Sequence, residues 1–421
     1  DTMAGKTLIN GTAYDITGGT CLKDGTSYSV KNGKVLISGT EYDISFLLPS
    51  GALSLWSSPY VNCEITCIAY GNGYWVVGGV RYDAGVYYAR IAYATSLDGP
   101  WTAKNLWRNS TSTFGRYSCI NCITYANGVF VVGGGQYLDT ASEWYPRIAY
   151  TASPNLTWTI KDIWTGYRYD TITGIAYGNG YWVVGGMYGT GSVYYARIAY
   201  ATSLGSTWTT KDLWGGTTSY NSVNSIVYGG GYFVLCGSRD AGNTPYARIA
   251  YATTPTSWTQ SDLWSINSNY NSSFSGIAAV DIAYGNGYWV VCGTYANSDT
   301  IYTQVAYTKS LSGTWTTRTL YVTEYTYCRP TSIAYANGEW VVCDRYTGNG
   351  SRFYGHVWYG NSPSTITNLK SVWGSVSGNE GVYAVAYADG YLVVGGMHYD
   401  GTAYNAQIAY ASAPDKLPTV T

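Results

Sequence analysis

Apolar runs recur along the chain at the spacing of a long repeat. The phrase Ile-Ala-Tyr followed by Asn-Gly, or a near equivalent, returns at anchors that lie 51 to 56 residues apart. The seven anchors are Ile68, Ile123, Ile175, Ile226, Ile282, Ile333 and Val385. A period near 50 residues without helical periodicity is typical of propeller blades. The pattern therefore predicts an all-β fold with a seven-bladed β-propeller.

Each repeat divides into four β-rich runs. In residues 172–214 the runs are ITGIAYG, YWVVGGMY, YARIAYATS and TWTTKDLW. The Asn179-Gly180 step between the first two favours a type I′ hairpin turn, which needs positive φ at both central residues. The second run is apolar on both faces, so it predicts a strand that is buried between neighbouring blades, with small residues at its end that allow a close approach.

The ends of the chain predict how the ring closes. The last repeat stops before any Asp-Leu-Trp segment, whereas a matching Leu53–Trp56 segment precedes the first repeat. Trp56 precedes Ile68 by 12 residues, as Trp214 precedes Ile226 by 12. We therefore expect an N-terminal strand to complete the last blade.

A different repeat occupies the first 48 residues. Gly11, Gly25 and Gly39 lie 14 residues apart, each within a strand, turn, strand pattern. Three short hairpins have too little core to be stable alone. The sequence predicts two domains: residues 1–48 form a small β-hairpin repeat module for anchoring or assembly, and residues 49–421 form the propeller.

Composition narrows the classes of function. The net charge is −1 and only 11% of the residues are charged, which disfavours nucleic acid as a partner. No apolar run approaches the roughly 18 residues that cross a bilayer, and the first 30 residues do not show the pattern of a signal peptide. We expect a soluble protein that does not insert into membranes.

The third run of four repeats carries an arginine. These residues are Arg90, Arg147, Arg197 and Arg248. They could form a cluster that binds a carboxylate, but the fourth run varies with them: Asn105, Asp162, Asp212 and Asp262 accompany arginine, whereas Thr319 and Ser371 accompany Gln304 and His356. Covariation of this kind is typical of cross-strand pairs, so we interpret the arginines as structural.

Nine cysteines raise the question of a metal. Cys63, Cys67, Cys119 and Cys122 precede or open two adjacent inner strands, so a zinc site is conceivable there. The repeat position of Cys67 and Cys122 holds Gly174, Ser225 and Asp281 elsewhere, which favours free thiols. We expect no metal and no cofactor, and we interpret Cys236, Cys292 and Cys343 as small buried strand residues, because they align with glycines.

Few residues suit catalysis. The histidines, His356 and His398, lie outside any Ser or Cys context that would indicate a triad. Glycoside hydrolysis needs two acids in one cleft, and nothing in the spacing pairs the acids near the inner strands or loops. These acids are Asp281, Glu324, Asp344 and Glu380. We expect no catalytic residues.

Long, unlike loops rich in Tyr, Asn, Ser and Gly connect the second to the third and the fourth to the first run of the repeats. Loops that vary among otherwise uniform repeats indicate a binding surface. Tyrosine offers a large amphipathic contact area, which is suitable for binding sugar rings. The sixth repeat departs most, with Asp344, Arg345, Arg352 and His356. We expect ligand contacts from Tyr82, Asp83, Arg116, Tyr117, Tyr167, Arg168, Tyr169, Tyr188, Tyr295, Tyr325, Arg345 and Tyr346.

Two family resemblances add to these predictions. The turns Ser96-Leu-Asp-Gly-Pro-Trp101 and Ser203-Leu-Gly-Ser-Thr-Trp208 resemble degenerate Asp-boxes of sialidase-like propellers, and the 14-residue hairpins are similar to N-terminal segments of phage and prophage tail or fibre proteins of Gram-positive bacteria. The second resemblance implies a virion tail protein, extracellular after lysis, that binds a bacterial cell-surface glycan and contacts other tail or assembly proteins, and copies of itself, through its N-terminal module. The alternatives are a sialidase-like glycan-cleaving enzyme and a bacterial surface lectin.

Overall fold

The structure is a computed structural model of the chain. It describes residues 50–59, 63–109, 118–138, 143–166, 170–217, 221–241, 244–265, 279–297, 300–321, 327–347, 353–373 and 380–420. Before residue 50 it describes only the backbone of six strands, which are β1 (Gly5–Ile9), β2 (Thr12–Thr17), β3 (Thr20–Lys23), β4 (Thr26–Lys31), β5 (Lys34–Ile37) and β6 (Thr40–Asp43). These six pair in sequence order as an antiparallel sheet, as consecutive hairpins require. The boundary between residues 48 and 49 stays a prediction.

The Asn-Gly steps form the tight turns that the sequence predicts. Asn179 and Gly180 have φ of 47° and 78°, so both lie in the left-handed region that a type I′ turn demands. Asn72-Gly73, Asn127-Gly128, Asn286-Gly287 and Asn337-Gly338 share this conformation. Each turn joins the first strand of a repeat to its second.

The strands that follow residue 50 occupy four positions in antiparallel sheets. The first strands are β8 (Glu64–Gly71), β12 (Cys119–Ala126), β16 (Thr171–Gly178), β20 (Ser222–Gly229), β24 (Ala279–Gly285), β28 (Tyr327–Ala336) and β32 (Gly381–Ala388). The second strands are β9 (Tyr74–Asp83), β13 (Val129–Leu138), β17 (Tyr181–Thr190), β21 (Tyr232–Asp240), β25 (Tyr288–Asn297), β29 (Glu339–Thr347) and β33 (Tyr391–Tyr399).

The outer two positions complete the sheets. The third strands are β10 (Val86–Ala94), β14 (Glu143–Thr151), β18 (Val193–Ala201), β22 (Pro245–Ala252), β26 (Thr300–Thr308), β30 (Phe353–Gly360) and β34 (Tyr404–Ala411). The fourth strands are β11 (Thr102–Arg108), β15 (Thr159–Asp162), β19 (Thr209–Thr217), β23 (Thr259–Ser265), β27 (Thr316–Leu320), β31 (Asn368–Trp373) and β7 (Gly51–Ser58).

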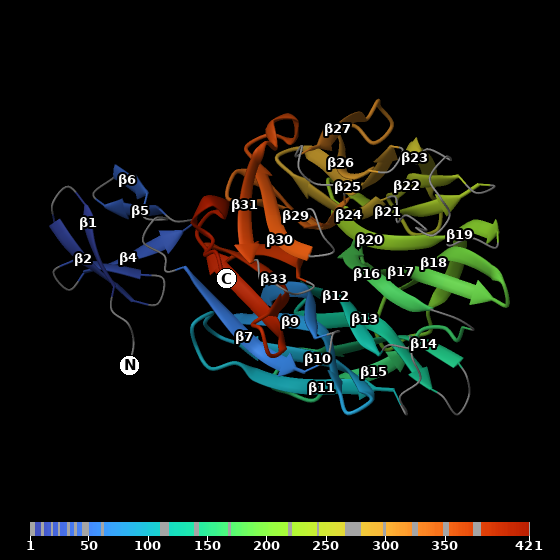
Figure 1. The fold of residues 1–421 in the computed structure, drawn as a ribbon, viewed down its shortest axis with the longest axis horizontal. Coiled ribbons are helices and arrows are strands. Elements are labelled where there is room, and N and C mark those ends of the chain that lie inside the picture. The colour runs from blue at the N-terminus through green and yellow to red at the C-terminus, as the bar shows by residue number, and fades with distance from the viewer. Residues whose placement is uncertain are drawn as a thin grey trace.

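The sheets form a β-propeller (Figure 1). Each first strand contacts the first strand of the next sheet, and β32 contacts β8, so the first strands close a ring around the centre. Five sheets have four strands, and a single parallel pair, Ile301 with Tyr327, joins β24–β27 and β28–β31 into one sheet of eight. The all-β propeller prediction is confirmed, while the number of seven blades stays a prediction. Among the described residues, no helix has the length and apolar character that crossing a membrane requires.

Buried second strands form the core between the sheets. Trp75, Val76 and Val77 are at most 1% exposed, which confirms the prediction of a strand that is buried on both faces. A Cβ on Gly78 would lie 2.7 Å from Cγ2 of Ile120 in the next sheet, so a small residue is needed there. Cys236, Cys292 and Cys343 are fully buried, as their alignment with the glycines predicts.

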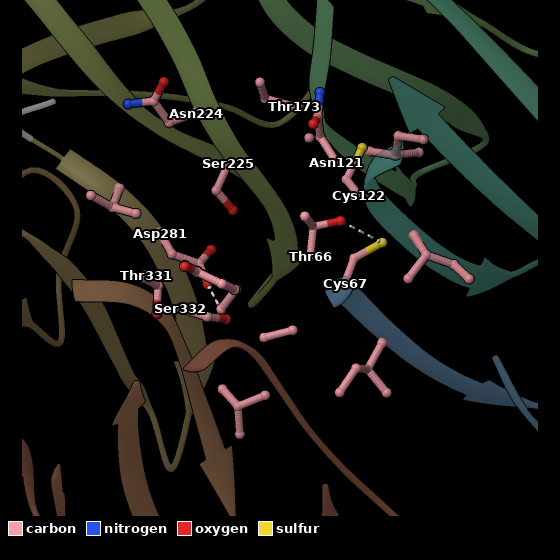
Figure 2. A pocket seen from close by; sticks show the side chains of 18 of the residues that line it. Thr66, Cys67, Asn121, Cys122, Thr173, Asn224, Ser225, Asp281, Thr331 and Ser332 are labelled. Carbon is pink, nitrogen blue, oxygen red and sulfur yellow. Dashed lines mark hydrogen bonds between the residues drawn. The ribbon is translucent and has the colours of Figure 1, made fainter. Parts of the chain in front are cut away.

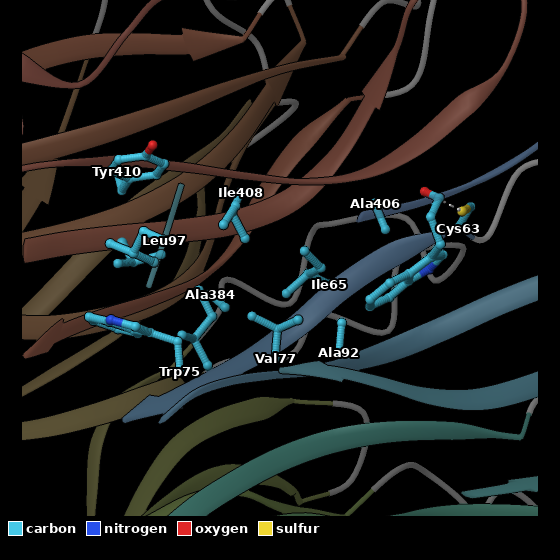
Figure 3. Close-up of a cluster of buried hydrophobic side chains, with 13 residues drawn as sticks. Cys63, Ile65, Trp75, Val77, Ala92, Leu97, Ala384, Ala406, Ile408 and Tyr410 are labelled. Carbon is cyan, nitrogen blue, oxygen red and sulfur yellow. Dashed lines mark hydrogen bonds between the residues drawn. The ribbon is translucent and has the colours of Figure 1, made fainter. Parts of the chain in front are cut away.

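The N-terminal strand closes the ring. β7 pairs antiparallel with β34, and Leu53 and Trp56 lie opposite Ile408 and Ala406. Trp56 is 6% exposed, and its Nε1 donates to the backbone oxygen of Val80, 3.1 Å away in the first sheet. Figure 3 shows β34 side chains beside those of β8 and β9 in the resulting apolar cluster. The predicted closure is confirmed.

The arginines of the third strands pair across the sheets. Arg147 lies opposite Asp162 and Arg197 opposite Asp212, and two hydrogen bonds of 2.6 and 2.9 Å hold the second pair. His356 and Ser371 take the same positions in β30 and β31. The structural interpretation of the arginines is therefore confirmed, and these side chains serve individual sheets rather than one shared ligand site.

Candidate functional site

A bulge in every first strand directs one side chain towards the centre of the ring. In β8 the pairing with β9 shifts between Ile65 and Cys67, so Thr66 is the extra residue. Bulges of this kind re-aim a side chain. The equivalent residues are Thr66, Asn121, Thr173, Asn224, Val280, Thr331 and Tyr383. They line a central cavity of about 200 Å³ (Figure 2).

The bulged side chains also join each sheet to the next. The Thr173 hydroxyl donates to the backbone oxygen of Val223 at 2.6 Å, and Asn224 donates through Nδ2 to that of Ala279 at 2.6 Å. Thr66, Asn121 and Thr331 make the same bond to the following sheet. Polar residues are therefore required here for the structure, and only a departure from the pattern indicates a further role.

The first departure is Val280, which has no group to donate. The next residue, Asp281, replaces the contact: its Oδ2 accepts from the Ser332 hydroxyl and from the backbone N–H of Ile333, both at 2.9 Å. Burial raises the pKa of Asp281, although these bonds oppose the shift. Figure 2 shows Asp281 and Ser332 across the cavity from Cys67 and Cys122. Because its oxygens are engaged, Asp281 is poorly suited to catalysis.

The second departure is Tyr383, which lies beside an arginine and an acid. The Arg345 Nη1 atom lies 3.3 Å from the Tyr383 hydroxyl oxygen and donates to it. Gly381 makes room for both, because a Cβ there would lie 2.8 Å from Tyr383 Cζ and 3.0 Å from Arg345 Cδ. Glu64, at the start of β8, is near enough for its charge to act on Tyr383 and for Arg345 to act on it. The ring thus places a phenol and a guanidinium from two sheets in contact, and an acid from a third sheet acts on both through its charge.

Burial controls the protonation of this cluster. It raises the pKa of the Tyr383 hydroxyl to about 12, with the nearby Glu64 charge acting in the same direction and Arg345 opposing it. Burial also raises the pKa of Glu64, against the effect of Arg345. Tyr383 therefore stays a neutral phenol that can donate and accept hydrogen bonds near neutral pH.

A neighbouring acid is already paired. Glu380 is fully buried, and its Oε1 lies 3.0 Å from His398 Nδ1 and accepts from the backbone N–H of Tyr399 at 3.3 Å. Its contacts fix the end of β33. Glu380 is therefore a structural residue of the last sheet rather than a free acid facing the cavity.

Paired aromatic side chains surround the top face, which is the end of the sheets opposite the Asn-Gly turns. Tyr82 lies opposite Tyr87 with ring centroids 4.5 Å apart, and Tyr188 opposite Tyr195 at 6.2 Å. We call these pairs the aromatic rim: Tyr82–Tyr87, Tyr137–Trp144, Tyr188–Tyr195, Tyr295–Tyr302, Tyr346–Tyr354 and Tyr399–Tyr404, with Arg239–Tyr246 in the same register. Rings in most of these pairs are partly exposed.

Six of the predicted contact residues belong to this region, on second strands rather than on loops. Tyr82, Tyr188, Tyr295 and Tyr346 are members of the rim, Asp83 forms an ion pair of 2.9 Å with Arg81, and Arg345 belongs to the cluster with Tyr383. Tyr346 is only 7% exposed and packs on His356, with ring centroids 4.0 Å apart. The others lie outside the described residues: Arg116, Tyr117, Tyr167, Arg168, Tyr169 and Tyr325.

Tyr383 and Glu64 are not among the residues predicted from the sequence. The signal was present, because Tyr383 is the one aromatic residue in the column two positions before the anchors. In the sequence these aligned positions look like other strand positions. Only the bulge, which the sequence does not reveal, turns their side chains towards the cavity. Glu64 lacks such a signal, since its role depends on Arg345 from a distant sheet.

The cysteines of the first two sheets are neutral thiols. Burial raises the pKa of Cys63, Cys67 and Cys119 to about 12, and that of Cys122 well above its usual range. Across the described part of the chain, no three His, Cys, Asp or Glu side chains come together in a way that could hold a metal ion.

The Asp-box-like turns lie on the opposite face from the cluster. They follow the third strands, and each closes with a tryptophan: Trp101 donates to the backbone oxygen of Leu97 at 3.2 Å and Trp208 to that of Leu204 at 3.4 Å. These turns therefore contribute to the fold and not to the chemistry of the top face.

Comparison with known proteins gives the fold alone. No family model and no curated protein sequence matches the chain. Among solved structures, the phage phi92 endosialidase has 10% identity and a TM-score of 0.52 over 88% of this chain and 69% of its own. The polysaccharide lyase Uly1 has 11% identity and a TM-score of 0.52 over 84% of this chain and 90% of its own.

A Trypanosoma rangeli sialidase in complex with sialic acid has 14% identity and a TM-score of 0.43 over 70% of this chain. The chain matches 54% of that sialidase, and so spans about half its length. The endosialidase and the lyase, with TM-scores above 0.5, support the fold.

Proposed function

We propose that this chain is a non-enzymatic carbohydrate-binding propeller, and that it acts as the receptor-binding protein of a phage or prophage tail. The aromatic rim is the observation that carries the proposal. Partly exposed tyrosines present both an apolar ring and a hydroxyl, the combination that suits the apolar face and the hydroxyl groups of a sugar. They surround a polar cavity, and the chain has a net charge of only −1, so uncharged polar ligands are favoured.

Protonation supports binding over cleavage. A nucleophile is activated by a lowered pKa or by an adjacent free base, whereas burial raises the pKa of Tyr383 to about 12. Glycoside hydrolysis by paired acids needs two carboxyl groups at one bond. Among the described residues, Asp281 in the cavity wall is held by hydrogen bonds, and Glu380 is paired with His398.

The competing proposal is a glycan-cleaving enzyme. The contact of Arg345 with Tyr383, within reach of the charge of Glu64, favours it, because a guanidinium, a phenol and an acid could bind and protonate a substrate. Release of reducing ends from polysaccharide would establish this alternative. Saturable adsorption without release of reducing ends would exclude it.

The tail assignment has two supports. The N-terminal sheet is built from repeated hairpins that resemble tail proteins, and a phage protein, the phi92 endosialidase, shares the propeller fold over 88% of the chain. We propose that the N-terminal sheet attaches to other tail proteins and to further copies of the chain, and that the top face binds a bacterial cell-surface glycan.

Adsorption of fluorescently labelled protein to Gram-positive cells tests the function. We expect saturable binding to a few strains, lost when periodate oxidises the surface polysaccharide. Replacing Tyr82 by Ala should weaken adsorption, because the rim loses one ring. Tyr74→Ala is the matched control. Tyr74 lies at the opposite end of the same strand, is also partly buried, and packs on Tyr93 with ring centroids 6.2 Å apart.

Two results would contradict the proposal. If adsorption is insensitive to periodate, the receptor is not a polysaccharide. If Tyr82→Ala and Tyr74→Ala reduce adsorption equally while both variants melt at the wild-type temperature, the top face is not the binding face.

A further inference from the structure

The fourth strand β27 lacks a feature that the fourth strands of five other sheets share. Between the third and fourth strands, five sheets contain a register shift next to the paired Arg, Gln or His. Strands β26 and β27 pair without it: Gln304 lies opposite Thr319, and Thr303 lies directly opposite Leu320. In β18 and β19, by contrast, the shift leaves Leu213 unpaired and brings Trp214 opposite Ala196.

The missing shift moves an aromatic residue to the surface. Leu320 takes the buried position and is 2% exposed, whereas Tyr321, the next residue, is 57% exposed. In sequence Tyr321 aligns with Trp214, which is 7% exposed. Among the described residues, Tyr321 is the most exposed large hydrophobic side chain. A one-residue change of register thus converts a core position into a surface ring.

Tyr321 does not stand alone. Its ring lies 5.8 Å from that of Tyr302, and Tyr302 in turn stacks on Tyr295 with centroids 6.4 Å apart and an interplanar angle of 29°. Tyr295 and Tyr302 form the member of the aromatic rim in this sheet, and Tyr302 remains partly exposed. The three rings form a continuous aromatic surface, which we call the tyrosine platform.

Within the sheet β24–β27, the described residues carry no positive charge beside the rings of the platform. Gln304 and Thr319 replace the Arg–Asp pair of other sheets and bond at 2.6 Å. The described cations of this sheet act elsewhere: Arg318 donates to the backbone oxygen of Ser364, and Lys309 contacts Tyr288. In the sequence, the charged residues of the adjoining segments 298–299 and 322–326 are the acids Asp299 and Glu324. Among the described residues of this sheet an anionic ligand would find no counter-charge, so charge complementarity favours a neutral one.

We propose that the tyrosine platform is a stacking site for a neutral pyranose ring of the cell-surface glycan. This inference rests on the proposed carbohydrate-binding function. One face of a pyranose presents axial C–H groups, which pack on an aromatic ring, while its equatorial hydroxyls stay in water or reach the tyrosine hydroxyls. The contact with Tyr302 restricts the orientations of Tyr321, which reduces the entropy that is lost on binding.

Titration of the full chain with soluble tetrasaccharides tests the platform. The probes are the neutral tetrasaccharides of glucose, galactose, mannose and N-acetylglucosamine, with tetragalacturonate as the acidic probe. We expect wild-type protein to bind a neutral probe, Y321A to lose about tenfold in affinity and Y321W to stay within about threefold of wild type. Tyr232→Ala is the matched control, because Tyr232 is 38% exposed and packs on Tyr251 beside a turn of the opposite face.

Each outcome assigns a failure to one of the two proposals. Unchanged affinity of Y321A overturns the platform while leaving carbohydrate binding in place. Preference for tetragalacturonate overturns the neutral ligand class. If no tetrasaccharide binds, periodate-sensitive adsorption to cells replaces the titration, and undiminished adsorption of Y321A again overturns the platform. Failure of the wild-type protein to adsorb to any cell overturns the proposed function and this inference with it.

Discussion

Deletion of residues 1–56 should lower the melting temperature of the protein by about 10 °C or more, whereas deletion of residues 1–48 should leave it nearly unchanged. The longer deletion removes the paired part of β7 up to Trp56, whose side chain is 6% exposed and donates to Val80. It also uncovers Ile408 and Ala406, which are fully buried against β7. The shorter deletion removes only the hairpin sheet.

Differential scanning calorimetry of the two truncated proteins measures this difference. A pair of point variants separates lost packing from altered chain length: Trp56→Ala should destabilise the protein by about 3–5 kcal/mol, whereas Ser57→Ala, at an exposed position of the same strand, should have little effect. Equal melting temperatures for the two truncations would refute closure of the ring by β7.

The second large effect concerns Asp344, which should make stability depend on pH. Asp344 occupies a position where the other sheets have glycine, and it is 1% exposed. Trp358 donates through Nε1 to its Oδ2 at 2.7 Å, and Oδ1 has no hydrogen-bond partner among the described residues. Burial raises the pKa of Asp344 from 3.8 to about 7, because the ionised carboxylate is poorly solvated there.

The sign follows from the direction of that shift. A carboxyl group whose pKa is raised by folding stabilises the protein fully below pH 3.8, and this contribution is lost as the pH rises through about 7. Asp344→Asn keeps the acceptor for Trp358 without ionising. We expect the Asn variant to be more stable than wild type at pH 8, by on the order of 3 kcal/mol, and similar to it at pH 4.

His356, which lies opposite Asp344 on β30, opposes this dependence. Burial lowers the pKa of His356 from 6.5 to about 3, so its effect on stability is fully favourable above pH 6.5 and is lost as the pH falls towards 3. Over pH 4 to 6.5 the two slopes oppose each other, and the wild-type curve should be shallow there. His356→Gln should remove the opposing slope, so that stability falls more steeply as the pH rises.

Urea unfolding at a series of pH values from 4 to 8 distinguishes these cases. The Asn variant should show the rising slope that His356 contributes, and the Gln variant the falling slope of Asp344. Parallel curves for wild type and Asp344→Asn would show that the carboxyl group at position 344 does not titrate within this range.

Much of the fold could be predicted from the sequence, because the devices that specify it are local or repeated. The Asn-Gly steps define the hairpins through positive φ, and the apolar second runs define the buried strands. The register of the outer strands followed from covariation between repeats. Arg197 is accompanied by Asp212, whereas His356 at the equivalent position is accompanied by Ser371, because directly opposed side chains must be compatible. The position of Trp56 before Ile68 predicted the closing strand through the same repeat arithmetic.

The chemistry of the top face was decided by tertiary structure, because it depends on single-residue shifts of register and on contacts between sheets. A bulge turns Tyr383 into the cavity, and Gly381 lets Arg345 reach it from the preceding sheet; neither effect has a signature within one strand. The absence of a shift opposite Thr303 exposes Tyr321, although its sequence context matches that of buried tryptophans. The sequence by itself thus determined the repeating scaffold and its closure, whereas the packing of one sheet on the next determined which side chains are available to a ligand.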